Sequence, residues 1–319
     1  MEDILFFVAN LGLFFFAYVI LTVGLNIQFG YAGLLNFAYI TFWAIGAYVT
    51  GVLILGPAPG HGITYILGFN LPFLVALIAG GVAAGALAAL MGALILRRLR
   101  SDFVAIGLFA LSFALYDIVG NYTPLFNGWD GILGVLPPLN IFQLDANAFT
   151  IYYLVPVGLA TLILYWAANL LQNSPYGRAL RAVRDDIDVA ASFGKNTVWL
   201  RWSALVIGCI YAGIAGGLMI GFLSALSPAS WASSETFIIW AALIVGGAGN
   251  NRGMLLGTFL FVIVALEATR FIPMPANVQN LIPALRLIVI GAVLIVVLLF
   301  RPQGLLPERR RIYALPGQS

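Results

Sequence analysis

A succession of apolar segments, each close to the length that crosses a membrane, constrains this chain more than any other feature. A helix that spans the hydrocarbon core of a bilayer needs about 20 apolar residues. Because lipid offers no hydrogen bonds to the backbone, such segments are stable there as helices. We therefore predict an all-α polytopic membrane protein, one domain over residues 1–319, with eight to ten transmembrane helices. The nine candidate spans are residues 4–24, 34–56, 71–96, 101–120, 150–171, 202–222, 236–249, 254–272 and 282–300.

Composition excludes several other classes of protein. Charged residues make up 8% of the chain and apolar residues 62%, against roughly 25% and 45–50% in soluble domains. The net charge of +3 is dispersed, so no basic patch is available for nucleic acid. No Gly-x-x-x-x-Gly-Lys-Ser/Thr phosphate motif occurs, and the single residues His61 and Cys209 cannot assemble a metal centre or a catalytic set. We expect membrane lipid as a partner, and no enzymatic activity, cofactor, metal or nucleic acid.

The distribution of Lys and Arg predicts the orientation, because loops on the cytoplasmic side retain these residues. Residues 121–149 contain no Lys or Arg and are predicted to be an exterior loop. Of the 15 basic residues, 13 fall on the opposite side, in residues 97–100, 174–201 and 301–319 and at Arg252. We therefore predict that the tail 301–319 is cytoplasmic. A count of nine spans places the N-terminus outside.

Two glycine motifs interrupt the apolar segments. Gly30-Tyr31-Ala32-Gly33 and Gly246-Gly247-Ala248-Gly249 both read Gly-x-Ala-Gly beside amide side chains. Corresponding breaks in two halves of a transporter indicate an internal repeat and a translocation path. Tight turns between spans are the alternative, and an inverted repeat would place the motifs on opposite sides, whereas the predicted topology places them on one. The candidate path residues are Asn26, Gly30, Gly33, Asn36, Gly246, Gly247 and Gly249.

Residues 174–194 form the one dense run of charge, with three arginines and three aspartates between positions 178 and 188. Ser174 is suited to cap a helix that begins at Pro175, and Gly194 is suited to end it. Between them the apolar and charged residues follow helical spacing, which predicts one short amphipathic helix. It is either a docking helix for a soluble cytoplasmic partner or a helix lying in the membrane interface. The candidate docking residues are Gly177, Arg178, Arg181, Arg184, Asp185 and Asp186.

Ionisable residues inside a membrane are functional candidates because unpaired burial is costly. Asp117, Glu267, Arg270 and Arg286 fall within or near predicted spans. Glu267 and Arg270 are three residues apart and are expected to pair along one helix, and contact with substrate is the alternative. Arg286 lies about one turn inside the last span.

Several motifs, in this order and spacing, resemble those of one known family between about residues 21 and 304. They are Gly24-Leu25-Asn26 with Gly30 to Leu35 and Gly46-Ala47-Tyr48, Asp102 to Ile106, Gly128-Trp129-Asp130-Gly131-Ile132, Ser174 to Ala182, and Val245 to Gly249. This pattern is similar to the permeases of branched-chain amino-acid ABC importers, in the LivM class of the LivM/LivH family. Related urea permeases are also similar.

The resemblance implies an ABC importer permease in the bacterial inner membrane. It further implies a second, related permease as partner, two cytoplasmic ATPase subunits that bind the ATP, and an exterior substrate-binding protein. In that family the segment similar to 174–194 couples the permease to the ATPases. The alternative is a self-sufficient channel or secondary transporter for a small polar solute such as urea. The sequence leaves open which amino acid is carried.

Overall fold

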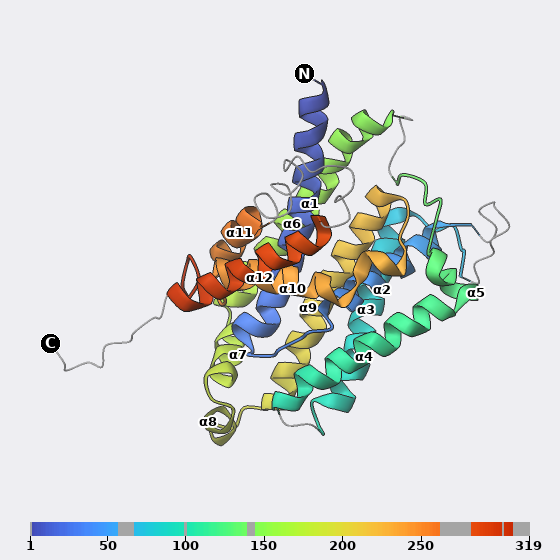
Figure 1. Cartoon of the computed structure of the whole chain (residues 1–319). Coiled ribbons are helices and arrows are strands. Elements are labelled where there is room, and N and C mark those ends of the chain that lie inside the picture. Colours follow the sequence, from blue (N-terminus) through green and yellow to red (C-terminus); the bar gives the residue numbers. More distant parts are fainter. Residues whose placement is uncertain are drawn as a thin grey trace.

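The computed structural model describes residues 2–56, 67–98, 101–138, 144–261, 282–301 and 303–308. Within these ranges the chain is helical and contains no strand, which confirms the predicted fold class (Figure 1). The helices are α1 (Glu2–Asn26), η1 (Ile27–Tyr31), α2 (Tyr39–Ile54), α3 (Phe73–Ile95), α4 (Ser101–Asn121), α5 (Thr123–Phe126), η2 (Gly128–Asp130), α6 (Ala146–Asn173), α7 (Pro175–Asp185), α8 (Ile187–Ser192), α9 (Thr197–Leu223), η3 (Pro228–Trp231), α10 (Ser233–Gly246), α11 (Asn251–Phe259) and α12 (Ile282–Phe300).

The described helices follow the predicted spans closely. Six are long and apolar enough to cross a membrane, and two shorter apolar helices, Tyr39–Ile54 and Ile288–Phe300, accompany them. Helix α2 begins five residues later than the predicted start at 34, because residues 32–38 are not helical. The predicted span 254–272 is described only to residue 261, where it belongs to α11 and the turn that follows.

Helix α9 lies at the centre of the bundle, packed against α1, α2 and α3. Glycines permit the close approach. A Cβ on Gly46 of α2 would collide with the backbone of Gly213 of α9, and a Cβ on Gly80 of α3 would lie 2.6 Å from the Gly46 carbonyl oxygen. Small residues allow transmembrane backbones to approach in this way. The helices α2, α3 and α9 therefore form a tightly packed trio.

A second group of helices packs beside this trio. Helix α1 contacts α6, α9, α10 and α11, while α10 packs against α11 and α12 (Figure 1). Gly246 of α10 and Gly257 of α11 face each other so closely that a Cβ on Gly257 would lie 2.5 Å from the Cα of Gly246. The two helices thus form a hairpin.

The two ends of the bundle differ in charge. At one end, the connection after α4 meets the connection after α9, where Ile132 and Leu226 exchange backbone hydrogen bonds of 2.8 and 2.9 Å. This connection belongs to the segment 121–149, which lacks Lys and Arg. The described basic residues gather at the other end, around α7 and α8: Arg97, Arg98, Arg178, Arg181, Arg184, Lys195, Arg201, Arg252 and Arg301.

Candidate functional site

The first glycine motif is a true break in a transmembrane segment. Helix α1 widens into the π-helical turn η1, the chain then runs without helical structure through residues 32–38, and α2 begins at Tyr39. Gly33 has φ +63°, a conformation that glycine adopts at little cost. The amides of Gly33 and Leu34 bond back to the carbonyls of Phe29 and Gln28 at 3.0 and 2.9 Å. The break therefore satisfies part of its own backbone.

The second motif is a tight turn that joins α10 to α11. Gly247 and Gly249 have φ values of +105° and +87°, which residues with a side chain rarely adopt. Asn250 then caps α11, because its side-chain oxygen accepts a hydrogen bond of 3.0 Å from the amide of Arg252. Of the two interpretations left open, a helix break applies to the first motif and a tight turn to the second.

The structure brings the two motifs into contact. The side-chain oxygen of Asn26 accepts a hydrogen bond of 2.8 Å from the amide of Gly249. A Cβ on Gly30 would lie 2.6 Å from the same nitrogen. Both motifs therefore lie at the same end of the bundle, as the predicted topology required. An inverted repeat does not relate them, since it would place them at opposite ends.

Asn251 joins three helices at this contact, which we call the junction (residues 26–33 with 246–251). Its side-chain oxygen accepts hydrogen bonds from Asn26 Nδ2 at 3.0 Å and from the Tyr31 hydroxyl at 2.5 Å. Its side-chain nitrogen donates to Asn169 Oδ1 of α6 at 2.9 Å. Gln172, also on α6, donates to the Gly249 carbonyl at 2.8 Å. Only 1% of Asn251 is exposed, and its bonds to Asn26 and Tyr31 are buried.

Asn36 lies in a separate buried group on the other side of the break. It donates to Gln28 Oε1 at 3.0 Å, and Gln28 Nε2 donates to the Leu205 carbonyl of α9 at 3.0 Å. The indole of Trp240 donates to the Asn36 carbonyl at 3.2 Å. Gln28 was not among the predicted path residues, although its position beside the first motif was a signal. Each of these amide side chains is bonded within the protein.

The charged segment forms two helices, so the prediction of one helix up to Gly194 was wrong. The predicted start is confirmed, because Ser174 Oγ accepts a hydrogen bond of 3.1 Å from the Gly177 amide at the beginning of α7. Asp186 interrupts the helix in an extended conformation, and its carboxylate accepts bonds of 2.9 Å from the amides of Asp188 and Val189. Aspartate is favoured at the N-cap position of a helix, and α8 begins directly after Asp186.

The inner face of α7 is fixed to the bundle. Leu180 and Val183 are fully buried, and a Cβ on Gly177 would collide with the Leu171 carbonyl at the end of α6. Gly177 therefore serves close packing, not an outward contact. Burial raises the pKa of the Tyr176 hydroxyl, which forms a hydrogen bond of 2.6 Å with Ser203 of α9.

The outer face of α7 and α8 carries both charge and exposed apolar surface. Of the candidate docking residues, Arg178, Asp185 and Asp186 are exposed. Val189 and Phe193 of the α8 region are also exposed, by 51% and 79%. The sequence interpretation assigned only charges to this face. The four-residue spacing of Val189 and Phe193 was the signal that it missed.

Arg181 and Arg184 point toward the junction. Arg184 Nη1 bonds to the Gly30 carbonyl and lies 2.8 Å from Glu308 Oε2. Arg181 Nε lies 3.7 Å from Glu308 Oε1. Three-quarters of each arginine side chain is shielded from water. Helix α7 thus touches the first motif directly.

Glu308 reaches this position because residues 303–308 run along the second motif. The amides of Leu305 and Leu306 bond to the carbonyls of Val245 and Gly246 at 2.9 and 3.2 Å. Asn250 Nδ2 donates to the Leu306 carbonyl at 3.2 Å. The tail segment therefore links the second motif to α7. Sequence reasoning missed Glu308, whose one signal was an acid directly before three arginines.

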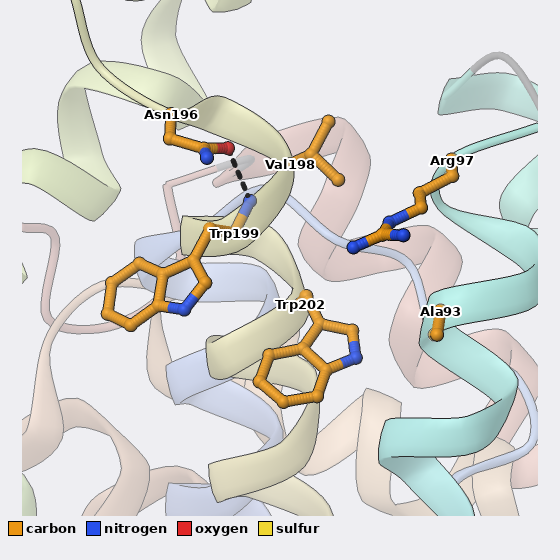
Figure 2. A pocket seen from close by; sticks show the side chains of 7 residues that line it. Ala93, Arg97, Asn196, Val198, Trp199 and Trp202 are labelled. Atoms are coloured by element: carbon orange, nitrogen blue, oxygen red, sulfur yellow. Dashed lines mark hydrogen bonds between the residues drawn. The ribbon is translucent and has the colours of Figure 1, made fainter.

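A cavity of about 560 Å³ lies away from the junction, between the end of α3 and the start of α9 (Figure 2). Asn196 caps α9 here by accepting a hydrogen bond of 3.0 Å from the Trp199 amide. The lining residues are Gly92, Ala93, Arg97, Asn196, Val198, Trp199 and Trp202. None of them belongs to either predicted set.

The remaining candidates have varied positions. Glu267, Arg270 and His61 lie outside the described residues, as does the side chain of Arg286. Asp117 is exposed on α4. In the part of the chain that the structure describes, no three His, Cys, Asp or Glu side chains are grouped as metal ligands would be.

Comparison with known proteins gives a consistent result. Residues 7–298 match the family described as branched-chain amino acid transport system / permease component. The chain is 28% identical to the high-affinity branched-chain amino acid transport system permease protein LivM of Salmonella typhimurium, over 92% of this chain and 68% of that protein. It is 27% identical to the probable LivM permease of Methanocaldococcus jannaschii, over 93% and 92%. It is 26% identical to the LivH permease of Escherichia coli, over 92% and 93%. No solved structure matches the chain.

Replacement of Asn251 by Leu should destabilise the protein, because it removes the three hydrogen bonds of a buried side chain and leaves the groups of Asn26 and Tyr31 unsatisfied. Each unsatisfied buried group costs about 1–3 kcal/mol. We expect a clearly lower midpoint of thermal unfolding, measured in detergent by loss of the monodisperse species. Asn173→Leu is the matched control, since the side chain of Asn173 is exposed and donates to the carbonyl of Asn169 one turn earlier. Equal stability of the two variants would contradict the role of Asn251.

Proposed function

The chain belongs to the family of branched-chain amino acid transport system permease components, and from that membership we propose that it carries leucine, isoleucine and valine across the membrane. The support for the substrate is that the relatives named above are branched-chain amino acid permeases of both LivM and LivH types. The chain acts as a permease subunit of an ABC importer and not as a self-sufficient channel. What the chain itself contributes to transport is part of the translocation path through the membrane.

The proposed partners are a second, related permease, two ATPase subunits and an exterior binding protein. The sequence has no phosphate-binding motif, so ATP is to be bound by the ATPases. The basic end of the bundle supports a cytoplasmic position for α7, α8 and the tail, because Lys and Arg are retained on that side. The protein would then sit in a bacterial inner membrane with its C-terminus inside.

We assign the coupling role to the segment 174–194. Its outer face would contact an ATPase through exposed residues of two kinds: the apolar pair Val189 and Phe193, and the charged group Arg178, Asp185 and Asp186. Apolar anchors surrounded by polar groups are typical of sites where binding energy is concentrated. Its inner face is held by Leu180 and Val183. A displacement of the outer face would therefore be transmitted to the bundle through the buried side chains of α7.

The junction is the proposed gate that receives this motion. Arg184 bonds to the Gly30 carbonyl of the break and pairs with Glu308, whose segment lies on the turn at Gly247. A displacement of α7 would shift both motifs together. Five of the path residues are buried in this structure, and we take their arrangement as the closed state of the proposed gate: Asn26, Gly30, Gly246, Gly247 and Gly249. Gly33 is exposed beside Arg184. Asn36 would line the path further in.

Reconstitution tests the function as a whole. Liposomes containing the chain with its second permease, ATPases and binding protein should take up radiolabelled leucine in the presence of ATP, with valine and isoleucine as competitors. Liposomes containing the chain alone should take up neither leucine nor urea, because the proposed gate stays closed without the ATPases that move α7. Uptake of either solute by the chain alone would overturn the importer role.

Phe193→Asp should weaken the association with the ATPase, since it places a charge where an apolar anchor is proposed. Loss of such an anchor costs about 2 kcal/mol, or roughly 30-fold in affinity. Co-purification and surface plasmon resonance with the isolated ATPase measure the effect. The control is Phe69→Asp, which makes the same change at a Phe that is 61% exposed at the opposite end of the bundle. If both variants bind the ATPase as the unaltered protein does, α8 is not the docking surface.

Glu308→Gln should reduce transport while leaving ATP hydrolysis in place, because it removes the partner shared by Arg181 and Arg184. For a pair that is partly exposed, the loss is about 1 kcal/mol, or roughly fivefold in uptake per ATP hydrolysed. The ratio of leucine uptake to phosphate release measures it. Asp188→Asn, which removes one exposed charge from α8, is the control. An unchanged ratio in Glu308→Gln would exclude the tail from coupling.

A further inference from the structure

The cavity between α3 and α9 lies where transmembrane helices meet water. Helix α3 ends at Ile95, and Arg97 follows two residues later. Helix α9 begins at Thr197, and its cap Asn196 lines the opposite wall. Both walls therefore belong to the basic end of the bundle. The volume of about 560 Å³ is within the range of roughly 300–1,000 Å³ typical of sites for small molecules.

Arg97 supplies the cavity with a positive charge. Its side chain extends from the end of α3 toward Trp202 on α9 (Figure 2). The ion pairs among the described residues involve Arg181 and Arg184, and none of them involves Arg97. A guanidinium group binds phosphate oxygens through two parallel hydrogen bonds. The charge of the cavity thus fits a phosphate group.

Two tryptophans give the cavity the chemistry of a membrane boundary. Trp202 is held in place because its indole donates to the Ala89 carbonyl of α3 at 2.9 Å. Trp199 is 52% exposed and packs edge-on against Tyr176 of α7. Tryptophan is enriched at the level of lipid headgroups because its ring is apolar and its N–H is polar. The cavity is therefore suited to a molecule with both kinds of surface.

An apolar track continues from the cavity along α3. Leu90 and Leu94 are exposed by 59% and 56%. Leu90 lies three residues before Ala93 and Leu94 three before Arg97, so the exposed leucines lie on the same side as these lining residues. A soluble phosphate would make no use of this track, whereas a lipid acyl chain would lie along it. The combination favours a lipid over a free anion.

We propose that this cavity binds the headgroup of an anionic phospholipid, with the phosphate at Arg97, the glycerol region against Trp199 and Trp202, and an acyl chain on the exposed leucines of α3. Basic pockets between transmembrane helices are known to hold acidic headgroups. The inference rests on the geometry of the helix ends and is independent of the substrate and direction of transport.

Native mass spectrometry of the full chain, with any subunits that co-purify, tests the proposal. Added phosphatidylglycerol should bind at lower concentration than phosphatidylcholine with the same acyl chains. Arg97→Gln should weaken phosphatidylglycerol binding about tenfold, as loss of a two-bond contact to phosphate implies. Arg98→Gln is the matched control, because Arg98 is the exposed neighbour that does not line the cavity. Equal weakening by both variants would indicate general surface charge and overturn the site.

Two further measurements separate the alternatives. Trp199→Ala leaves the charge intact and should weaken phosphatidylglycerol binding severalfold, so the proposal stays testable if Arg97→Gln does not fold. Soluble glycerol phosphate should compete poorly, because it lacks the acyl chain. Displacement of the lipid by millimolar glycerol phosphate, or equal binding of phosphatidylcholine, would exclude a lipid site.

Discussion

Backbone that leaves helical geometry inside a bilayer has to find its hydrogen bonds within the protein, and the rest of this structure depends on how residues 27–38 meet that requirement. The carbonyls of Gly30 and Asn36 accept hydrogen bonds from Arg184 and Trp240, and the amide of Ala38 donates to the side-chain oxygen of Asn36. A carboxamide carries both a donor and an acceptor and no net charge. It therefore satisfies a broken backbone without the desolvation cost of an ion. The side chain of Asn251 uses both groups on other side chains, since it bonds to those of Asn26, Tyr31 and Asn169.

The same requirement explains why α7 is connected to the break. A carbonyl released at Gly30 accepts its hydrogen bond from Arg184, which belongs to the amphipathic helix α7. The positive charge is balanced by Glu308 from a third part of the chain. The hydrogen bond that the Gly30 carbonyl requires is thus supplied by a side chain of α7. Any movement of α7 must either disrupt these hydrogen bonds and ion pairs or move residues 27–38 together with the helix.

The sequence predicted the helices well because the bilayer itself sets their length. The bounds of α3, α4 and α12 differ from the predicted spans by at most two residues. The start of α7 was also predictable, since Ser174 caps it through a local rule. The break at Asp186 was not, because helical spacing and a capping residue competed in the same segment. The helical spacing of apolar and charged residues predicted one helix, whereas Asp186 caps a second helix and so divides the segment into α7 and α8.

The contacts of the junction were beyond sequence reasoning for a different reason. Gly30 and Gly249, or Arg184 and Glu308, are far apart in the chain, and no local period or spacing relates them. The residue types were informative, since glycines and amides at helix ends were predicted as candidate path residues. Their contact with one another was not predicted. Their pairing depends on how α1, α10 and α11 pack, which the pattern of apolar residues leaves undetermined.

The glycine contacts among α2, α3 and α9 have an electrical consequence. A seam in which the backbones at Gly46, Gly80 and Gly213 leave no room for a Cβ also has no room for a file of water molecules. Protons and small cations cross proteins along such files. These three helices therefore form a seam that is closed to water and to ions that move with it, separate from the gate proposed at the junction.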